Sequence, residues 1–210
     1  VYKPTLGTVS AFGTSITGKK PYEITKFGVA RTFQNIRLFK DLTVLDNIMI
    51  AMDNDPSRKH FGPITSLFRT RSVVDNEISQ ETRAAELLEI FNLTSRRFEL
   101  AKNLPYGDQR RLEIARALAL NPKVLMLDEP AAGFNPQEKE DLGNLIRKIR
   151  DKGFAVLLIE HDMQLVMGIS DQLFVLDAGR RIADGTPADI QRNPEVQRAY
   201  LGSPTAATPA

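Results

Sequence analysis

The 210-residue sequence predicts an α/β fold with a largely parallel core sheet. Strand-like and helix-like segments alternate along most of the chain, which is typical of that class. Two apolar runs, 124–127 and 155–159, predict strands that are buried on both faces. A polar pair follows each run: Asp128-Glu129 and Glu160-His161. Because ligands bind at the carboxyl ends of parallel strands, we expect a site there.

The composition narrows the possible functions. The 28 basic and 26 acidic residues leave a net charge of +2, whereas a nucleic-acid binder usually has a basic excess on one face, so we expect no nucleic-acid partner. The sequence contains no cysteine, which excludes disulfides and thiolate metal sites. No apolar run approaches the roughly 20 residues that span a bilayer. Membrane association is therefore expected to come through partner proteins.

Turn residues and hydrophobic spacing predict each element in order. In the first half these are a strand over 8–12, a helix over 22–27 closed by Gly28, a strand-like run over 29–34, a helix over 42–52, a peripheral insertion over 53–80 and a helix over 82–91. In the second half, beside the two apolar strands, these are helices over 108–120, 136–151 and 163–169, strands over 173–176 and 181–183 around a turn at 177–180, and short helices near Pro187 and Pro194. Asn135 and Asp162 are expected to cap the helices that follow them.

Asp128 and Glu129 form a Walker B pattern, in which a buried strand delivers two adjacent carboxylates. One carboxylate can hold Mg²⁺, usually through water, and the other can orient or deprotonate an attacking water. The alternative is an ordinary strand followed by a charged turn.

Three further segments could take part in phosphate chemistry. Gly107 leads into a helix whose free amides can face an anion, although a routine junction capped by Asp108 has the same pattern. His161 can donate a hydrogen bond to a phosphate oxygen, or it can be a surface residue. Gln34 can ligate Mg²⁺ or position water, or it can be a solvent-facing glutamine.

Taken together and in this order, these segments resemble the ABC ATPase family. Three strings, 30–39, 106–116 and 158–163, resemble the LivG-type ATP-binding subunits of branched-chain amino acid importers. The resemblance implies a P-loop NTPase-like domain with a helical subdomain, ATP and Mg²⁺ as cofactors, and catalytic roles for Glu129, His161 and Gln34. It also implies that Asp128 and Gln34 bind Mg²⁺. The signature motif, which would contact the ATP of a partner subunit, comprises Leu104, Pro105, Tyr106, Gly107, Asp108 and Gln109, and the D-loop comprises Ala131, Ala132, Gly133, Phe134, Asn135 and Pro136.

The same resemblance implies a division of the chain and a set of partners. Residues 1–41 would hold a partial N-terminal β region with the Q-loop, 42–120 the helical subdomain, 121–202 the core with Walker B, D-loop and switch histidine, and 203–210 a disordered tail. The expected partners are transmembrane permease subunits, a second ABC ATPase subunit and, indirectly, a periplasmic or extracellular binding protein. The expected location is the cytoplasmic face of the membrane.

The phosphate-binding Walker A loop, G-x-x-x-x-G-K-S/T, has one near-match over 13–20. We reject it because Lys20 cannot coordinate Mg²⁺ and Pro21 disfavours a helix starting near Gly18. The resemblance places these residues in a hairpin region and the true loop before Val1. We therefore expect an N-terminally truncated domain, inactive as given.

Pro105 occupies the signature serine position and supplies neither a hydroxyl nor an N–H there. Together with the missing loop, it favours an alternative function, a non-catalytic module that docks a permease or partner subunit without nucleotide. A DNA-repair ATPase of this family would carry a long coiled-coil insertion. This alternative is disfavoured because the sequence contains no sustained heptad pattern.

Overall fold

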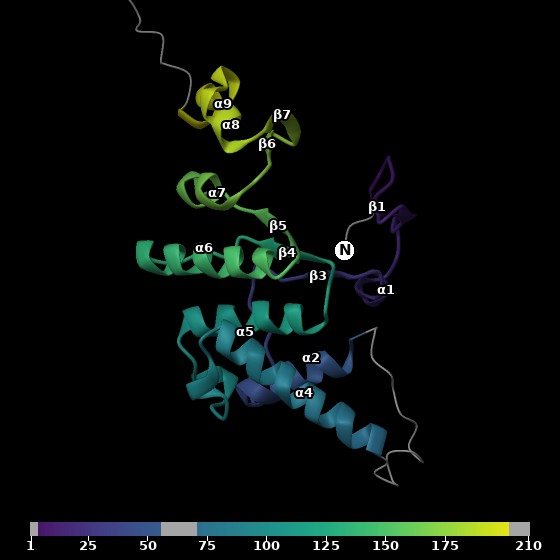
Figure 1. Ribbon diagram of the computed structural model, residues 1–210. Helices are drawn as coiled ribbons and strands as arrows, with labels where there is room; N and C mark the ends of the chain where they lie inside the picture. The colour runs from purple at the N-terminus through teal and green to yellow at the C-terminus, as the bar shows by residue number, and fades with distance from the viewer. Residues whose placement is uncertain (1–3, 56–70, 202–210) are drawn as a thin grey trace, which may run out of the picture. The chain divides into compact units, whose positions relative to one another are not determined.

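The computed structural model describes residues 4–55 and 71–201. Two compact units divide the chain, Val1–Glu160 and His161–Ala210. The first unit carries a three-stranded parallel sheet with the order β3-β4-β5 (Figure 1), which confirms the predicted fold class. Its strands are β3 (Val29–Arg31), β4 (Val124–Asp128) and β5 (Ala155–Ile159). Our division at residues 41, 120 and 202 stays a prediction, and the tail over 203–210 lies outside the described residues.

The register of the sheet places three strand ends at one edge. Arg31 pairs with Met126, and Asp128 pairs with Ile159. Because all three strands run in one direction, the segments beginning at Thr32, Glu129 and Glu160 leave the sheet together. This edge is where the predicted site has to be built.

The expected burial of β5 on both faces is wrong. Leu157 and Ile159 are 46% and 51% exposed, while their neighbours Val156 and Leu158 are half-buried. Successive side chains of a strand point to opposite faces, and α6 (Pro136–Asp151) contacts β5. An apolar run therefore marked a strand correctly but did not determine how many of its faces are covered.

Three helices pack together beside the sheet: α2 (Val44–Asp53), α4 (Arg71–Ile90) and α5 (Tyr106–Ala119) (Figure 1). Their shared core includes Ile48, Leu88 and Leu118, each at most 2% exposed. Two polar contacts tie the bundle to other segments. Asn47 Nδ2 donates to the Phe39 carbonyl at 3.0 Å, and Arg83 Nη1 lies 2.9 Å from the buried Asp55 Oδ2.

Two helices start earlier than predicted. α4 begins at Arg71 rather than residue 82, because no Gly or Pro interrupts 71–90, even though residues 71–80 lack a strong apolar periodicity. α5 begins at Tyr106 and ends at Ala119, and its N-cap is Pro105, not Asp108. Proline is suited to helix starts because its own missing N–H needs no partner there. The insertion predicted over 53–80 lies partly outside the described residues.

The N-terminal segment confirms that the near-match to Walker A is not a phosphate loop. Residues 10–11 and 14–15 form the antiparallel strands β1 (Ser10–Ala11) and β2 (Thr14–Ser15), a shorter first strand than predicted. No helix begins at Gly18, because α1 (Pro21–Lys26) begins at Pro21 with Lys20 as its N-cap. One-turn 3₁₀ helices over Thr94–Arg96 and Ala101–Asn103 were not predicted.

Over residues 161–201, the second unit forms a hairpin and three helices. β6 (Leu173–Asp177) pairs with β7 (Arg180–Gly185) in antiparallel fashion. The predicted turn is confirmed, with Ala178 and Gly179 both at positive φ, as a two-residue hairpin loop requires. The helices are α7 (Met163–Ile169), α8 (Pro187–Arg192) and α9 (Pro194–Leu201). In the described parts of the chain, no helix combines the length and apolar character needed to cross a bilayer.

Candidate ATP-hydrolysis site

The three strand ends bring Gln34, Asp128 and Glu129 together. Gln34 Nε2 donates a hydrogen bond to Glu129 Oε2 at 3.1 Å. Gln34 lies three residues beyond β3, whereas Asp128 ends β4 and Glu129 follows it. Gln34 and Glu129 are 95 positions apart in the sequence, and the parallel sheet places them at one edge.

Glu129 has an unusual backbone conformation. Its φ is +45°, a left-handed value that costs an L-residue of this kind roughly 1 kcal/mol or more. The surrounding backbone holds it there, since Glu129 N–H donates to the Ile159 carbonyl at 2.9 Å and Ala132 N–H donates to the Glu129 carbonyl at 3.2 Å. The chain therefore turns sharply at the proposed base, and such strain gathers at functional sites.

Asp128 is paired with a cation. Arg31 Nη2 lies 2.7 Å from Asp128 Oδ2, and the two side chains are 53% and 23% exposed. Exposed pairs of this kind contribute about 0–1 kcal/mol, so another cation can displace the guanidinium at low cost. The oxygens of Asp128 and Gln34 suit Mg²⁺, which is usually held by one or two carboxylates together with substrate phosphates.

The segment after Glu129 is the predicted D-loop. Glu160 Oε1 accepts a hydrogen bond from Ala131 N–H at 2.8 Å, so the polar pair after β5 supports this loop. Gly133 has a φ of +80°. Asn135 caps α6 as predicted: its Oδ1 accepts from Glu138 N–H at 2.9 Å, and Pro136 takes the first helical position.

The predicted signature motif forms the start of α5. Leu104 is buried, and its carbonyl accepts a hydrogen bond from Gln109 Nε2 at 2.8 Å. Pro105 caps the helix without a side-chain hydrogen bond. The amides of Tyr106, Gly107 and Asp108 occupy the first three helical positions, which have no acceptor within the helix. These amides and the positive end of the helix dipole suit an anion.

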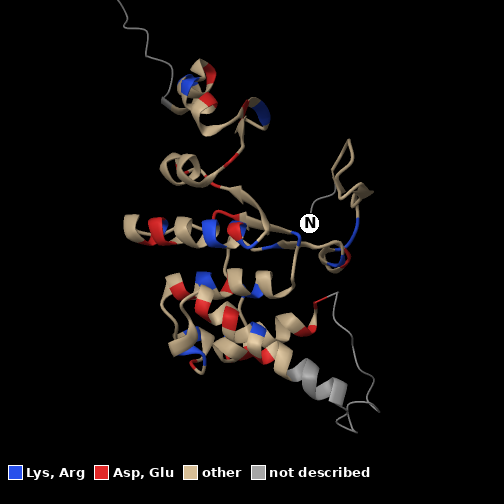
Figure 2. Ribbon diagram, in the orientation of Figure 1, with Lys and Arg blue, Asp and Glu red and all other residues tan. Residues whose placement is uncertain are grey.

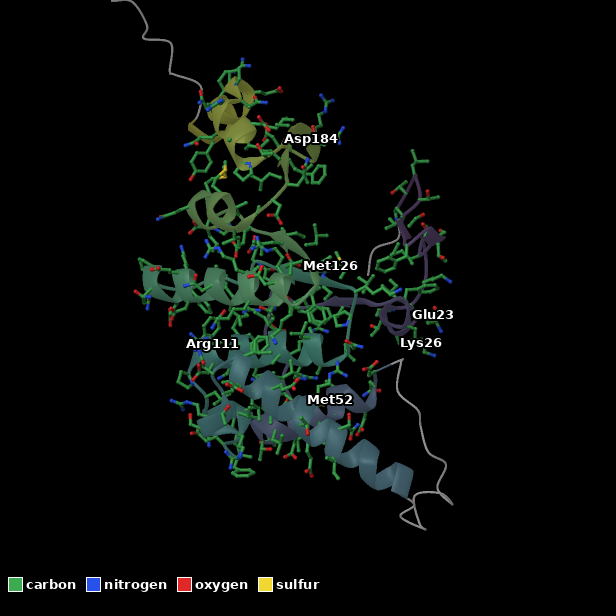
Figure 3. All side chains as sticks on the ribbon, in the orientation of Figure 1. Glu23, Lys26, Met52, Arg111, Met126 and Asp184 are labelled. Carbon is green, nitrogen blue, oxygen red and sulfur yellow. The ribbon has the colours of Figure 1, made fainter. Side chains whose placement is uncertain are left out.

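Salt bridges hold this helix start in place. Asp108 Oδ2 lies 3.3 Å from Arg96 Nε. Arg111 Nη2 lies 3.5 Å from Asp141 Oδ2, which links α5 to α6, and Figure 3 labels Arg111 beside these helices. Both signs of charge occur on each of these two helices (Figure 2). These ion pairs are partly exposed, so each is expected to contribute little by itself.

His161 belongs to the other unit. It is exposed and directly precedes Asp162, whose Oδ1 accepts from Leu165 N–H at 3.0 Å and caps α7 as predicted. Since a unit boundary separates His161 from Glu129, the role of His161 as a switch residue stays a prediction.

Sequence reasoning missed two residues next to this site. Arg110 is 1% exposed and pairs with Glu113, with Nη1 2.7 Å from Oε2. In the sequence they are opposite charges three residues apart on a helix, which is the usual pattern of a solvated surface pair. Only the apolar residues that flank Glu113, at 112, 114 and 115, could have suggested that this helix is covered on most sides.

The parallel sheet with polar residues at its strand ends is typical of ligand-binding α/β domains, and comparison with known proteins identifies the family. The family model described as "ABC transporter" matches residues 1–132, and the one described as "Branched-chain amino acid ATP-binding cassette transporter" matches residues 180–206. The chain therefore belongs to the ABC transporter family, as one of its ATP-binding subunits.

Two relatives show the similarity over nearly the whole chain. The chain is 45% identical over 202 residues to the high-affinity branched-chain amino acid transport ATP-binding protein LivG of Escherichia coli (strain K12), covering 96% of this chain and 78% of the relative. It is 46% identical, with the same coverage, to BraF of Pseudomonas aeruginosa, which has the same description. The solved ADP conformation of MJ1267, an ATP-binding cassette of an ABC transporter, matches with a TM-score of 0.76 and 32% identity, covering 96% of this chain and 79% of that one.

Membership settles the general activity. ABC ATPases bind and hydrolyse ATP, and their ATP-binding subunits dimerise and work with transmembrane permeases. The predicted family and fold are thus confirmed. The roles of individual side chains remain proposals.

Proposed function

We propose that this chain is the ATP-hydrolysing subunit of an importer for branched-chain amino acids, attached through permease subunits to the cytoplasmic face of the membrane. The hydrogen bond between Gln34 and Glu129, beside Asp128 at the sheet edge, carries the proposal. The substrate class comes from the described activity of the LivG and BraF relatives. A binding protein outside the membrane would select the solute.

Each residue at the sheet edge has a distinct task in this proposal. Glu129 orients and deprotonates the water that attacks the γ-phosphate. Asp128 and Gln34 would hold Mg²⁺, and this ion, when bound, neutralises phosphate charge. His161 would donate a hydrogen bond to the γ-phosphate.

The signature motif would serve the ATP of a second ABC subunit. The amides of Gly107 and Asp108 at the start of α5 can donate to phosphate oxygens, while Pro105 has no hydroxyl to add. The D-loop, 131–136, follows Glu129 directly and is expected to lie at the same dimer interface. The partner is expected to be a homologous subunit rather than an identical one.

A groove next to Gln34 is our candidate for the permease contact. It has a volume of about 460 Å³ and is lined by residues on both sides of Gln34, from 31 to 39, by the end of α2 and by the second half of α5. Two guanidinium groups stack on its aromatic rings, Arg37 on Phe33 at 4.2 Å and Arg116 on Phe39 at 4.6 Å. Apart from Glu113, which is paired with Arg110, and Asn54, the lining is cationic and apolar, which suits a permease segment that carries a carboxylate among apolar side chains.

The alternative function is a docking module without nucleotide. Pro105 favours it, as does the absence of a G-x-x-x-x-G-K-S/T match from the 210 residues. By the same argument, a polypeptide of these residues alone is expected to hydrolyse no ATP.

One experiment distinguishes the two. We would measure MgATP binding and phosphate release by the natural-length protein, and the uptake of labelled leucine by cells that depend on it. The proposal expects ATP binding, turnover and uptake. A natural-length protein that restores uptake without binding ATP would establish the docking module instead.

The groove has its own test. Ile50→Glu places a carboxylate in the groove without touching Gln34 or Glu129. We expect loss of uptake and of co-purification with the permease, with subunit ATPase activity retained. Unchanged co-purification would place the permease contact elsewhere.

A further inference from the structure

Arg110 is a buried cation to which the proposed chemistry gives no role. Its side chain is 1% exposed, and Glu113, its ionic partner, is 6% exposed. Burying such a pair is costly, and replacement of buried ion pairs by apolar residues is often neutral or stabilising. Packing alone therefore gives no reason for an arginine at this position.

The guanidinium of Arg110 binds the backbone of the segment that carries Gln34. Nη1 donates to the Phe33 carbonyl at 2.8 Å, and Nη2 donates to the Gln34 carbonyl at 2.8 Å. A planar fork can hold two successive carbonyls at fixed directions, which the single ammonium of lysine cannot. The orientation of Gln34 is thus set partly by a residue on α5.

Tyr106 connects the same guanidinium to the D-loop. Arg110 Nη2 donates to the Tyr106 hydroxyl at 3.3 Å, and that hydroxyl donates to the Ala132 carbonyl at 3.3 Å. The Tyr106 ring meets Phe134 edge-on, with 6.1 Å between the ring centroids. The link depends on the tyrosine hydroxyl, which both accepts from Arg110 and donates to Ala132.

The donors of Arg110 are almost fully used. Its two terminal nitrogens together serve Phe33, Gln34, Glu113 and Tyr106. Within the described part of the chain, Nε has no hydrogen-bond partner. A displacement of the start of α5 would therefore act on the Gln34 backbone through the guanidinium that both share.

We propose that Tyr106 and Arg110 are positioning residues that couple the start of α5 and the D-loop to Gln34, and through Gln34 to Glu129. The inference rests on the proposed ATPase function. When the signature end of α5 and the D-loop engage a second subunit, the guanidinium transmits their position to the amide that contacts the base.

The first test needs no nucleotide. Hydrogen exchange is measured in the natural-length protein for wild type, Arg110→Lys and Tyr106→Phe, with the exposed Arg150→Lys and Tyr200→Phe as matched controls. Arg37 N–H donates to Glu113 Oε1 at 3.2 Å, so peptides containing Arg37 report on whether Arg110 and Glu113 still hold the segment that carries Gln34. We expect several-fold faster exchange over 33–38 in Arg110→Lys and over 131–136 in Tyr106→Phe, and no change in either control.

The second test is a double-mutant cycle with Gln34→Ala. Arg110→Lys alone is expected to lower kcat about tenfold with the KM for ATP changed less than about twofold, a loss typical of one charge-assisted hydrogen bond. If Arg110 acts through Gln34, adding Arg110→Lys to Gln34→Ala lowers kcat by less than about twofold. Fold losses that multiply would overturn the proposal.

If Arg110→Lys does not fold, Tyr106→Phe can still test the proposal. Tyr106 is 49% exposed, and the substitution removes only the hydroxyl, so the same cycle can be run with it. Wild-type protein without ATP turnover would refute the proposed function, and hydrogen exchange would then still decide whether Arg110 and Tyr106 hold the two loops. Unchanged exchange over both loops refutes the coupling whatever the activity.

Discussion

The side-chain amide of Gln34 contacts the carboxylate of Glu129, with Nε2 3.1 Å from Oε2. The residue proposed to sense Mg²⁺ therefore orients the residue proposed to activate water. The contact fixes these two side chains relative to one another. Such positioning lowers the cost of reaching the reactive geometry.

Glu129→Gln should abolish turnover without abolishing binding. An amide cannot accept the proton of the attacking water, while its oxygen can still accept the hydrogen bond from Gln34. We expect phosphate release by the natural-length protein to fall about 10²–10³-fold. The matched control is Glu140→Gln on the exposed face of α6. Turnover above a tenth of wild type would exclude Glu129 as the base.

Arg31→Ala should change the Mg²⁺ requirement of the ATPase. Arg31 neutralises Asp128 at 2.7 Å, so its removal frees that carboxylate for the metal. We expect half-maximal activity at a lower Mg²⁺ concentration, and a melting temperature within about 3 °C of wild type because exposed pairs contribute little. Arg181→Ala, which removes an exposed pair with Asp184, is the control. An unchanged Mg²⁺ curve would show that Arg31 and the metal do not compete.

Glu113→Ala should be among the most destabilising single changes on α5. It leaves the Arg110 cation buried without its ionic partner, which typically costs about 3–5 kcal/mol. Urea unfolding of the natural-length protein measures the change. The double variant Arg110→Met/Glu113→Leu should regain most of the stability, since it removes both charges. A cost below about 1 kcal/mol for Glu113→Ala would mean that water reaches this pair in solution.

Acid should weaken the start of α8 through Asp189. A hydrogen bond from the Thr186 side chain, and a second from its backbone, lower the pKa of Asp189 below its ordinary value of 3.8. Because the folded pKa is the lower one, this stabilisation is present above the ordinary value and is lost as the pH falls through the lowered value. Thr186→Ala should raise the pKa of Asp189 toward 3.8, as NMR titration can measure. An unchanged pKa would mean that the Thr186 hydroxyl has no part in the shift.

Local patterns predicted the elements whose causes are local. The cap of α6 by Asn135, the turn at 177–180 and the two strands β4 and β5 of a parallel sheet are all confirmed. Each of these features depends on residues that are close together in the sequence, such as a cap, a turn or a short apolar run. The predicted start of α4 was wrong because the first turns of this helix carry no periodic apolar face, although they contain no helix-breaking residue.

By itself, the sequence determined the family, the order of the motifs and the strand ends that carry Gln34, Asp128 and Glu129. Only the tertiary structure decided that Gln34 meets Glu129 and that Arg110 is buried against the Phe33 and Gln34 carbonyls. These contacts join residues 76–95 positions apart, and no local propensity encodes them. Two opposite charges at helical spacing usually form a pair on the surface. Here the packing of α5 against the strand ends excludes water from Arg110 and Glu113, which no local pattern indicates.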